Sequence, residues 1–280
     1  MKHLDGFDDL TESVIDMAQT EDGLAVENII GIASGKGGVG KSTVAVNMAI
    51  ALTQLGKDVA IMDCDVYGFS IPKILGIANK APKVNKGKIE PIEAHGVKVL
   101  SMGNLVSEDT PIIWRGPMLG KMLRQFVSDV NWGAVEYLLL DLPPGTGDIA
   151  LDVAHNMPKS FLIIVTTPEP LAASVATRAG NAALKINQSL LGVIENMSGF
   201  ICPHCEKETK IFTGDGGTAL ASALDIPLLG KIPFDIYVQT ATEIKKPSFF
   251  RTESIAIAYK AIAKRTINEL SKLNCLERTD

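Results

Sequence analysis

The sequence is poor in cysteine, in aromatic residues and in long apolar runs. Its 280 residues include four cysteines and 5% aromatic residues. Only Cys202 and Cys205 lie close together, which argues against a disulfide framework. No apolar run approaches the roughly 20 residues of a membrane-spanning helix, and residues 1–9 lack the pattern of a signal peptide. We therefore expect a cytoplasmic protein that does not bind membranes.

The sequence also lacks an excess of positive charge. Its formal net charge is −5, whereas a general nucleic-acid binder is expected to be basic. We therefore predict no nucleic-acid partner. What the chain does have is 46% hydrophobic residues, enough for one large α/β domain with a full core. We expect residues 1–26 to be a flexible, acidic lead-in and residues 27–280 to form that domain.

A glycine-rich stretch, G-K-G-G-V-G-K-S-T at residues 35–43, lies between an apolar run at 29–33 and a helix-like run at 44–52. This is the strand, loop and helix context in which G-x-x-x-x-G-K-[ST] binds phosphate. The backbone N–H groups would surround a phosphate at the positive end of the helix. Lys41 would reach the β- and γ-phosphates, and Ser42 would bind Mg²⁺. The predicted nucleotide-binding residues of this loop are Gly35, Lys36, Gly37, Gly38, Val39, Gly40, Lys41, Ser42 and Thr43.

A second lysine in the loop, Lys36, is not required for a basic P-loop. Its ammonium can point away from its own loop and, in a face-to-face dimer, reach a phosphate bound by the partner; simple solvent exposure is the alternative. The K-G-G-V-G-K-[ST] pattern resembles the deviant P-loop of the nitrogenase iron protein, MinD and ParA ATPases. That resemblance implies a single doubly wound, mainly parallel sheet with helices on both faces, ATP hydrolysis with Lys36 and Lys41 as catalytic residues, and a homodimer.

Carboxylates follow two further strand-like runs, which end at Asp63 and Asp141. The carboxyl ends of strands are where open α/β sheets bind ligands. By the same resemblance, Asp63 and Asp141 would complete the Mg²⁺ site, and Asp65 would orient the attacking water. Gly145, in D-L-P-P-G-T-G-D, would contact the γ-phosphate and move when it leaves. The alternatives are helix-capping carboxylates and an ordinary proline turn.

A third strand-like run ends at Asn196, and a later one is followed by Pro233 and Asp235. Asn196 aligns with the asparagine that recognises adenine in the resembled family, because an amide can both donate to and accept from a base edge. Pro233 and Asp235 resemble the loop that covers the base. Taken alone, an asparagine at a strand end is only a turn former.

The C-P-H-C motif supplies Cys202 and Cys205 as two thiolates, in an expected insertion loop near residues 198–216. A [4Fe–4S] cluster or a structural zinc takes four ligands, and a two-fold dimer would complete the set. M-S-x-x-x-C-P-x-C and D-L-P-P-G-T-G-D resemble iron–sulfur cluster carriers of the Mrp/ApbC type. The resemblance implies a slow ATPase that binds a labile [4Fe–4S] cluster across a homodimer and transfers it to apo iron–sulfur proteins.

Alternatives to the carrier remain open from the residues alone. Zinc could replace the cluster, since the thiolate ligands suit both. A C-P-H-C pair also occurs in redox enzymes, although here it precedes a polar segment and not a helix. A MinD/ParA-like positioning ATPase would use its C-terminal amphipathic helix, residues 254–273 here, to bind a membrane. The modest apolar face of this helix instead predicts packing on the sheet.

Overall fold

The computed structural model describes residues 26–65, 68–105, 116–145, 153–155, 157, 159–202, 204–205, 207–234 and 247–276. The predicted lead-in up to residue 25 and Asp235 lie outside these ranges, and the first strand begins at Val26. The elements in chain order are β1 (Val26–Ser34), α2 (Lys41–Gln54), β2 (Val59–Asp63), α3 (Ile71–Leu75), β3 (Lys83–Asn85), β4 (Lys88–Glu90), β5 (Ile92–Ala94), β6 (Val97–Ser101), η2 (Met102–Asn104), α4 (Gly116–Ser128), β7 (Val135–Asp141), β8 (Phe161–Thr166), α6 (Pro170–Lys185), β9 (Ser189–Ile201), β10 (Glu208–Thr209), α7 (Gly216–Leu224), β11 (Leu228–Phe234), η3 (Ser248–Phe250) and α9 (Glu253–Leu276).

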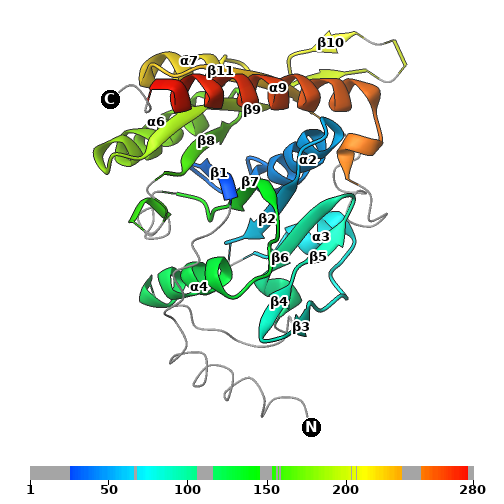
Figure 1. Ribbon diagram of the computed structural model, residues 1–280. Coiled ribbons are helices and arrows are strands. Elements are labelled where there is room, and N and C mark those ends of the chain that lie inside the picture. Colours follow the sequence, from blue (N-terminus) through cyan, green and yellow to red (C-terminus); the bar gives the residue numbers. More distant parts are fainter. Residues whose placement is uncertain are drawn as a thin grey trace.

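A nine-stranded sheet forms the centre of the molecule (Figure 1). Its main path runs β10-β9-β8-β1-β7-β2-β6-β5, and β11 pairs with β9 on the side away from β8. The strands from β11 to β6 pair in parallel, and β5 and β10 are antiparallel additions. This confirms the predicted mainly parallel, doubly wound sheet. Because parallel strands end at one edge, the loops after β1, β2 and β7 meet there.

Helices cover both faces of the sheet because its strands are apolar on both sides. In β1, Ile30 and Ile32 face one core with α2 and α9, while the alternate residues Ile29 and Ala33 face the other. That second core includes Leu123 of α4 as well as buried residues of α6 and α7. The helix α2 is buried along most of its length, which fixes the P-loop at its amino end against the sheet.

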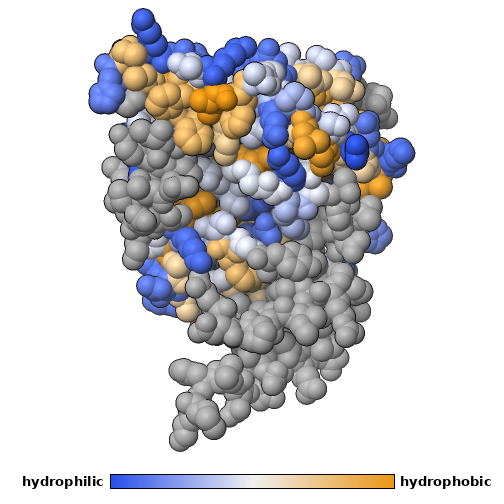
Figure 2. All heavy atoms as spheres, turned by 180° about the vertical axis from the view of Figure 1, so that it is seen from behind, coloured by the Kyte–Doolittle hydropathy of each residue, from blue (hydrophilic) through white to orange (hydrophobic). Residues whose placement is uncertain are grey.

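The C-terminal helix α9 packs against the body of the protein. Its buried apolar residues are Ile255, Tyr259, Ile262, Ala263 and Leu270, which form part of the core shared with α2. This confirms the predicted packing on the sheet. Among the described helices, none is long and apolar enough to cross a bilayer. Figure 2 shows hydrophobic side chains on the rear face in separate groups, divided by hydrophilic ones.

The segment around the two cysteines is more regular than the loop expected at residues 198–216. β9 extends beyond its last pairing with β8, and Phe200 pairs with Thr209 of β10 on one side and with Phe234 of β11 on the other. Cys202 and Cys205 therefore occupy the turn of a β9–β10 hairpin, visible as a projection in Figure 1. With only two residues, β10 is too short to produce an alternating sequence pattern.

Candidate functional site

The P-loop joins β1 to α2 and encloses a cavity of about 310 Å³. Gly40 occupies the N-cap of α2 with φ +85°, a left-handed conformation that favours glycine. A Cβ on Gly40 would overlap the side-chain amide of Asn196, and one on Gly35 would lie 2.5 Å from the Ala176 backbone nitrogen in α6. These glycines therefore allow the loop to fit between β9 and α6. The cavity is lined by Ser34, Lys36, Gly37, Gly38, Val39, Gly40, Lys41, Ser42, Thr43, Asp65, Ser70, Ile74, Pro144 and Ser248.

Replacing Gly40 with alanine is expected to weaken nucleotide binding and to destabilise the fold. The new Cβ would strain a left-handed backbone by about 1–3 kcal/mol and displace the Asn196 amide. Isothermal titration with MgADP and thermal unfolding would measure both effects. Gly56→Ala is a matched control, because Gly56 also has a positive φ but open space around its Cβ position. Nucleotide affinity in Gly40→Ala equal to that of the control would contradict this reading.

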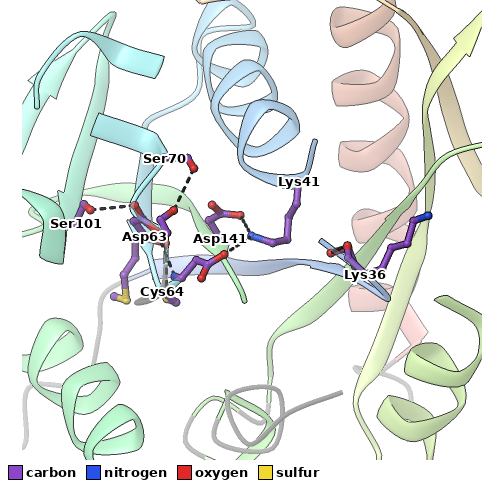
Figure 3. Close-up of polar contacts among 11 residues, drawn as sticks. Lys36, Lys41, Asp63, Cys64, Ser70, Ser101 and Asp141 are labelled. Atoms are coloured by element: carbon purple, nitrogen blue, oxygen red, sulfur yellow. Dashed lines mark hydrogen bonds and ion pairs between the residues drawn. The ribbon is translucent and has the colours of Figure 1, made fainter. Parts of the chain in front are cut away.

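One lysine and three carboxylates gather at the amino end of α2. The Lys41 ammonium lies 2.6 Å from Asp141 Oδ1 and 3.7 Å from Asp65 Oδ2. Asp63 accepts hydrogen bonds from the Ser101 hydroxyl at 2.9 Å and from the Asp65 backbone N–H at 3.2 Å. Figure 3 shows Lys41 directed toward Asp141. The strand ends of β2 and β7 thus place their carboxylates beside the P-loop lysine, as their sequence positions predict.

Burial makes this carboxylate cluster electrostatically unusual. Asp63 and Asp141 are completely buried. Desolvation, followed by the charge of Asp141, raises the pKa of Asp63 to about 8. Desolvation also raises the pKa of Asp141, against the attraction of Lys41. A bound cation would offset this desolvation and favour the ionised carboxylates.

The donor set fits the Mg²⁺ that a P-loop nucleotide carries. Asp141 Oδ2 is buried and has no hydrogen-bond partner among the described residues, so it can accept from water bound to such an ion. Mg²⁺ prefers oxygen ligands and keeps several waters. Ser42 and Asp65 both line the cavity. The assignment of Ser42, Asp63 and Asp141 to Mg²⁺ stays a prediction.

The second P-loop lysine points away from this cluster (Figure 3). The Lys36 ammonium lies 2.8 Å from Glu169 Oε2, at the N-cap position of α6. Both side chains are about 40% exposed, so the pair is weak enough to be exchanged. This direction suits contact with a partner's phosphate, and that role stays a prediction.

At the predicted switch, Gly145 donates its backbone N–H to the Ser34 carbonyl at 2.8 Å. Contact between this N–H and a phosphate would require that hydrogen bond to break.

A smaller cavity of about 60 Å³ continues from the P-loop toward β9 and β11. Gly40, Thr43 and Ser248 line both cavities. Asn196 lines the smaller one and donates from Nδ2 to the Val39 carbonyl at 2.9 Å. The structure therefore brings Asn196 and Pro233 together beside the loop, where a base would follow the phosphates. Adenine recognition by these residues stays a prediction, and Asp235 lies outside the described residues.

The two cysteines of the hairpin differ from the buried Cys64. Cys202 is half-buried and Cys205 is exposed, and the Cys202 backbone N–H donates to the Lys207 carbonyl at 3.1 Å. The backbone N–H groups of His204 and Cys205 lower the pKa of the Cys202 thiol, which favours the thiolate that binds metal. Cys64 is instead completely buried, and desolvation raises its thiol pKa well above the usual value. It is a structural residue.

Several contributors to the site were missed by reasoning from the sequence. Ser101 orients Asp63, Glu169 binds Lys36, and Ser248 lines both cavities. All three lie far along the chain from their partners and belong to no motif.

Comparison with known proteins identifies the family of this chain. Residues 25–267 match the family described as ParA, NUBPL iron-transfer P-loop NTPase. The chain is 47% identical over 242 residues to the iron-sulfur cluster carrier protein of Bacillus subtilis, covering 86% of this chain and 68% of that protein. It is 43% identical over 248 residues to the carrier protein of Methanocaldococcus jannaschii, covering 88% and 86% of the two chains.

Solved structures agree with the fold. A nucleotide-binding protein from Archaeoglobus fulgidus, solved with ADP and containing cobalt, superposes with a TM-score of 0.72 at 33% identity, over 84% of this chain and 93% of that one. The cell division ATPase MinD of Pyrococcus furiosus superposes with a TM-score of 0.60 at 23% identity, over 88% and 99% of the two chains. The P-loop between β1 and α2, the carboxylates at the ends of β2 and β7 and these similarities together show that the chain belongs to the ParA family of NUBPL-type iron-transfer P-loop NTPases.

Proposed function

We propose that this protein is a slow, Mg²⁺-dependent ATPase that carries a labile [4Fe–4S] cluster as cargo between two subunits and transfers it to apo iron–sulfur proteins. The family is one of iron-transfer NTPases, and two relatives with over 40% identity are named iron-sulfur cluster carriers. We place the activity in the cytoplasm, as the sequence predicts.

The observation that carries the proposal is the ligand count at the β9–β10 hairpin. Each chain presents Cys202 and Cys205 at an accessible turn. Within the described ranges, no group of three or more histidine, cysteine, aspartate or glutamate side chains is placed to bind a metal. Since a [4Fe–4S] cluster is bound by four thiolates, two copies of the hairpin related by a two-fold axis supply the complete set.

The P-loop residues have separate parts in ATP hydrolysis. Backbone N–H groups of the loop bind the phosphates, and Lys41 stabilises the charge that develops on the γ-phosphoryl group. Asp65, whose Oδ2 lies 3.7 Å from that ammonium, would orient the attacking water. Mg²⁺, when bound, neutralises phosphate charge next to Ser42. Lys36 would exchange Glu169 for a phosphate of the partner subunit.

A single strand connects the two sites. β9 carries Asn196 beside the nucleotide cavity and ends next to Cys202. Five residues lie between them, and β9 is irregular there, since Met197 has φ +58° and the pairing with β11 shifts register before Phe200. A change in nucleotide state can therefore reach the thiolates through one continuous strand.

Replacing Cys202 and Cys205 with alanine is expected to abolish cluster binding while leaving nucleotide binding intact. Anaerobic reconstitution with iron and sulfide, followed by iron, sulfide and zinc analysis and an absorbance spectrum, would measure this. We expect about four iron and four sulfide per wild-type dimer and none in the double variant. Cys275→Ala, which removes another exposed thiol, should bind the full cluster.

Other outcomes would contradict the proposal. Zinc alone in the wild-type protein, with iron and sulfide present, would indicate a zinc-bridged dimer. Iron and sulfide retained by the double variant would place the cluster elsewhere. Transfer to an acceptor protein that is unaffected by loss of ATP hydrolysis would separate the two activities.

A further inference from the structure

Glu195 is a carboxylate buried in the middle of β9, and no part of the proposed chemistry uses it. Its side chain is 1% exposed. Oε2 accepts a hydrogen bond from the Gly217 backbone N–H at 2.7 Å, and Oε1 lies 3.1 Å from the Lys231 ammonium. Both oxygens are therefore engaged, one at the amino end of α7 and the other on the neighbouring strand β11.

The approach of α7 to Glu195 depends on glycine. A Cβ on Gly217 would lie 2.6 Å from Glu195 Cβ, and a Cβ on Gly216 would lie 2.6 Å from the Thr167 carbonyl oxygen. Asp215 has the N-cap position of α7, yet its side chain does not cap the helix. Glu195 provides that acceptor from β9, so the start of α7 is fixed to this strand.

Lys231, which pairs with Glu195, also leads to the segment that follows β10 in the cysteine hairpin. The Lys231 ammonium also lies 3.2 Å from Asp215 Oδ1, and the Lys210 ammonium lies 3.8 Å from that oxygen. Lys210 directly follows β10, the second strand of the hairpin. A continuous series of ion pairs thus runs from Glu195 through Lys231 and Asp215 to the hairpin.

The other face of β9 reaches the nucleotide cavity. Side chains of consecutive strand residues point to opposite faces, and Asn196, next to Glu195, donates to the Val39 carbonyl of the P-loop. On β11, Lys231 pairs in register with Glu195, and the next residues, Ile232 and Pro233, line the smaller cavity. Glu195 and Lys231 therefore lie between the smaller cavity and the segment that follows β10.

We infer that Glu195, with Lys231, is a positioning pair that couples nucleotide binding to metal binding at Cys202 and Cys205. The inference rests on the proposed function, because it requires a metal-binding hairpin. Movement of β9 or β11 on nucleotide binding would be passed through the pair to α7 and to the segment that follows β10. The pair touches neither nucleotide nor metal, so its removal should change the coupling more than either affinity.

The test is a thermodynamic cycle with the full-length, reduced protein under anaerobic conditions. Co²⁺ is titrated in excess Mg²⁺, with and without saturating ADP, and thiolate-to-cobalt charge-transfer absorbance reports Co²⁺ bound to cysteine and not Co²⁺ bound to oxygen ligands. For wild type we expect ADP to change the apparent Co²⁺ dissociation constant by about fivefold or more. In Glu195→Gln we expect this factor to fall below about twofold, while Co²⁺ affinity without nucleotide and ADP affinity without Co²⁺ each change by less than about threefold.

Matched variants distinguish coupling from simple loss of structure. Glutamine retains an oxygen that can accept from the Gly217 N–H. The double variant Glu195→Gln/Lys231→Met leaves no buried charge without a partner, so it should fold if the single variant does not, and it should also be uncoupled. Glu269→Gln breaks a different ion pair, with Lys272 on α9, and should keep the wild-type factor.

A folded Glu195 variant with the wild-type coupling factor would overturn the inference and leave the carrier function intact. Wild-type protein that binds Co²⁺ through its thiolates without any effect of ADP would do the same. Absence of thiolate-bound Co²⁺ in wild type would overturn both the inference and the proposed function. Uncoupling in both Glu195 variants, with each single affinity retained, is the supporting result.

Discussion

Replacing Lys41 with methionine is expected to lower the rate of ATP hydrolysis by about two to three orders of magnitude. The Lys41 side chain is 6% exposed and lies at the amino end of α2, where it is fixed before the γ-phosphoryl group develops its transition-state charge. Methionine has a similar length and no charge, so the loss of hydrolysis rate measures the contribution of the Lys41 ammonium. Steady-state hydrolysis with saturating Mg²⁺, beside a separate measurement of ATP affinity, would divide the effect between catalysis and binding.

The same substitution should destabilise the nucleotide-free protein. Lys41 is the cation 2.6 Å from the buried Asp141 carboxylate, and breaking a buried pair from one side costs about 3–5 kcal/mol. Thermal unfolding in EDTA would show this. Lys57→Met is the control, because Lys57 pairs with Glu136 in a partly exposed ion pair, and neither residue lines the nucleotide cavity. Hydrolysis by Lys41→Met at the wild-type rate would contradict the assigned role.

Replacing Asp63 with asparagine is expected to stabilise the metal-free protein and to remove its response to Mg²⁺. Asp63 is completely buried beside Asp141, so its charge is unfavourable until a cation arrives. Asparagine can accept from the Asp65 N–H and donate to the Ser101 hydroxyl, which preserves the local contacts. We expect the melting temperature in EDTA to rise by about 2–6 °C, corresponding to one or two kcal/mol in a domain of this size.

Function should change in the opposite direction. With one buried carboxylate removed, MgADP should stabilise Asp63→Asn much less than wild type, and Mg²⁺-dependent hydrolysis should fall by at least about tenfold. Asp58→Asn, directly before the other end of β2, is the matched control. A melting temperature that falls in Asp63→Asn, with Mg²⁺-dependent hydrolysis retained, would show that Asp63 serves the fold and not the ion.

Much of the fold follows from local sequence signals. Apolar runs of five to seven residues alternate with helical segments, which predicts a parallel α/β sheet. The structure confirms this architecture and the packing of α9. The β9–β10 hairpin was not foreseen, because β10 has two residues and its pairing with β9 depends on contacts across the turn.

Part of the candidate site could also be predicted from the sequence. The P-loop was identifiable because its glycines, lysine and hydroxyl residues are contiguous, and each has a backbone or phosphate role fixed by its position in the loop. The convergence of Asp63 and Asp141 was also foreseeable, since parallel strands end at one edge of the sheet. Family membership confirms the P-loop NTPase that these residues indicated.

The sequence by itself therefore determined the phosphate-binding loop, the strand-end carboxylates and the pair of thiols, because each depends on residues close together in the chain. Only the tertiary structure decided that Lys36 contacts Glu169, 133 residues away, and that Glu195 fixes the start of α7. The Lys36 contact arises because the N-cap of α6 lies beside the P-loop. The Glu195 contact arises from the register of β9 with β11 and from the close approach that Gly217 permits. Neither leaves a periodic or local pattern, since side-chain contacts between distant segments form only when the sheet has assembled.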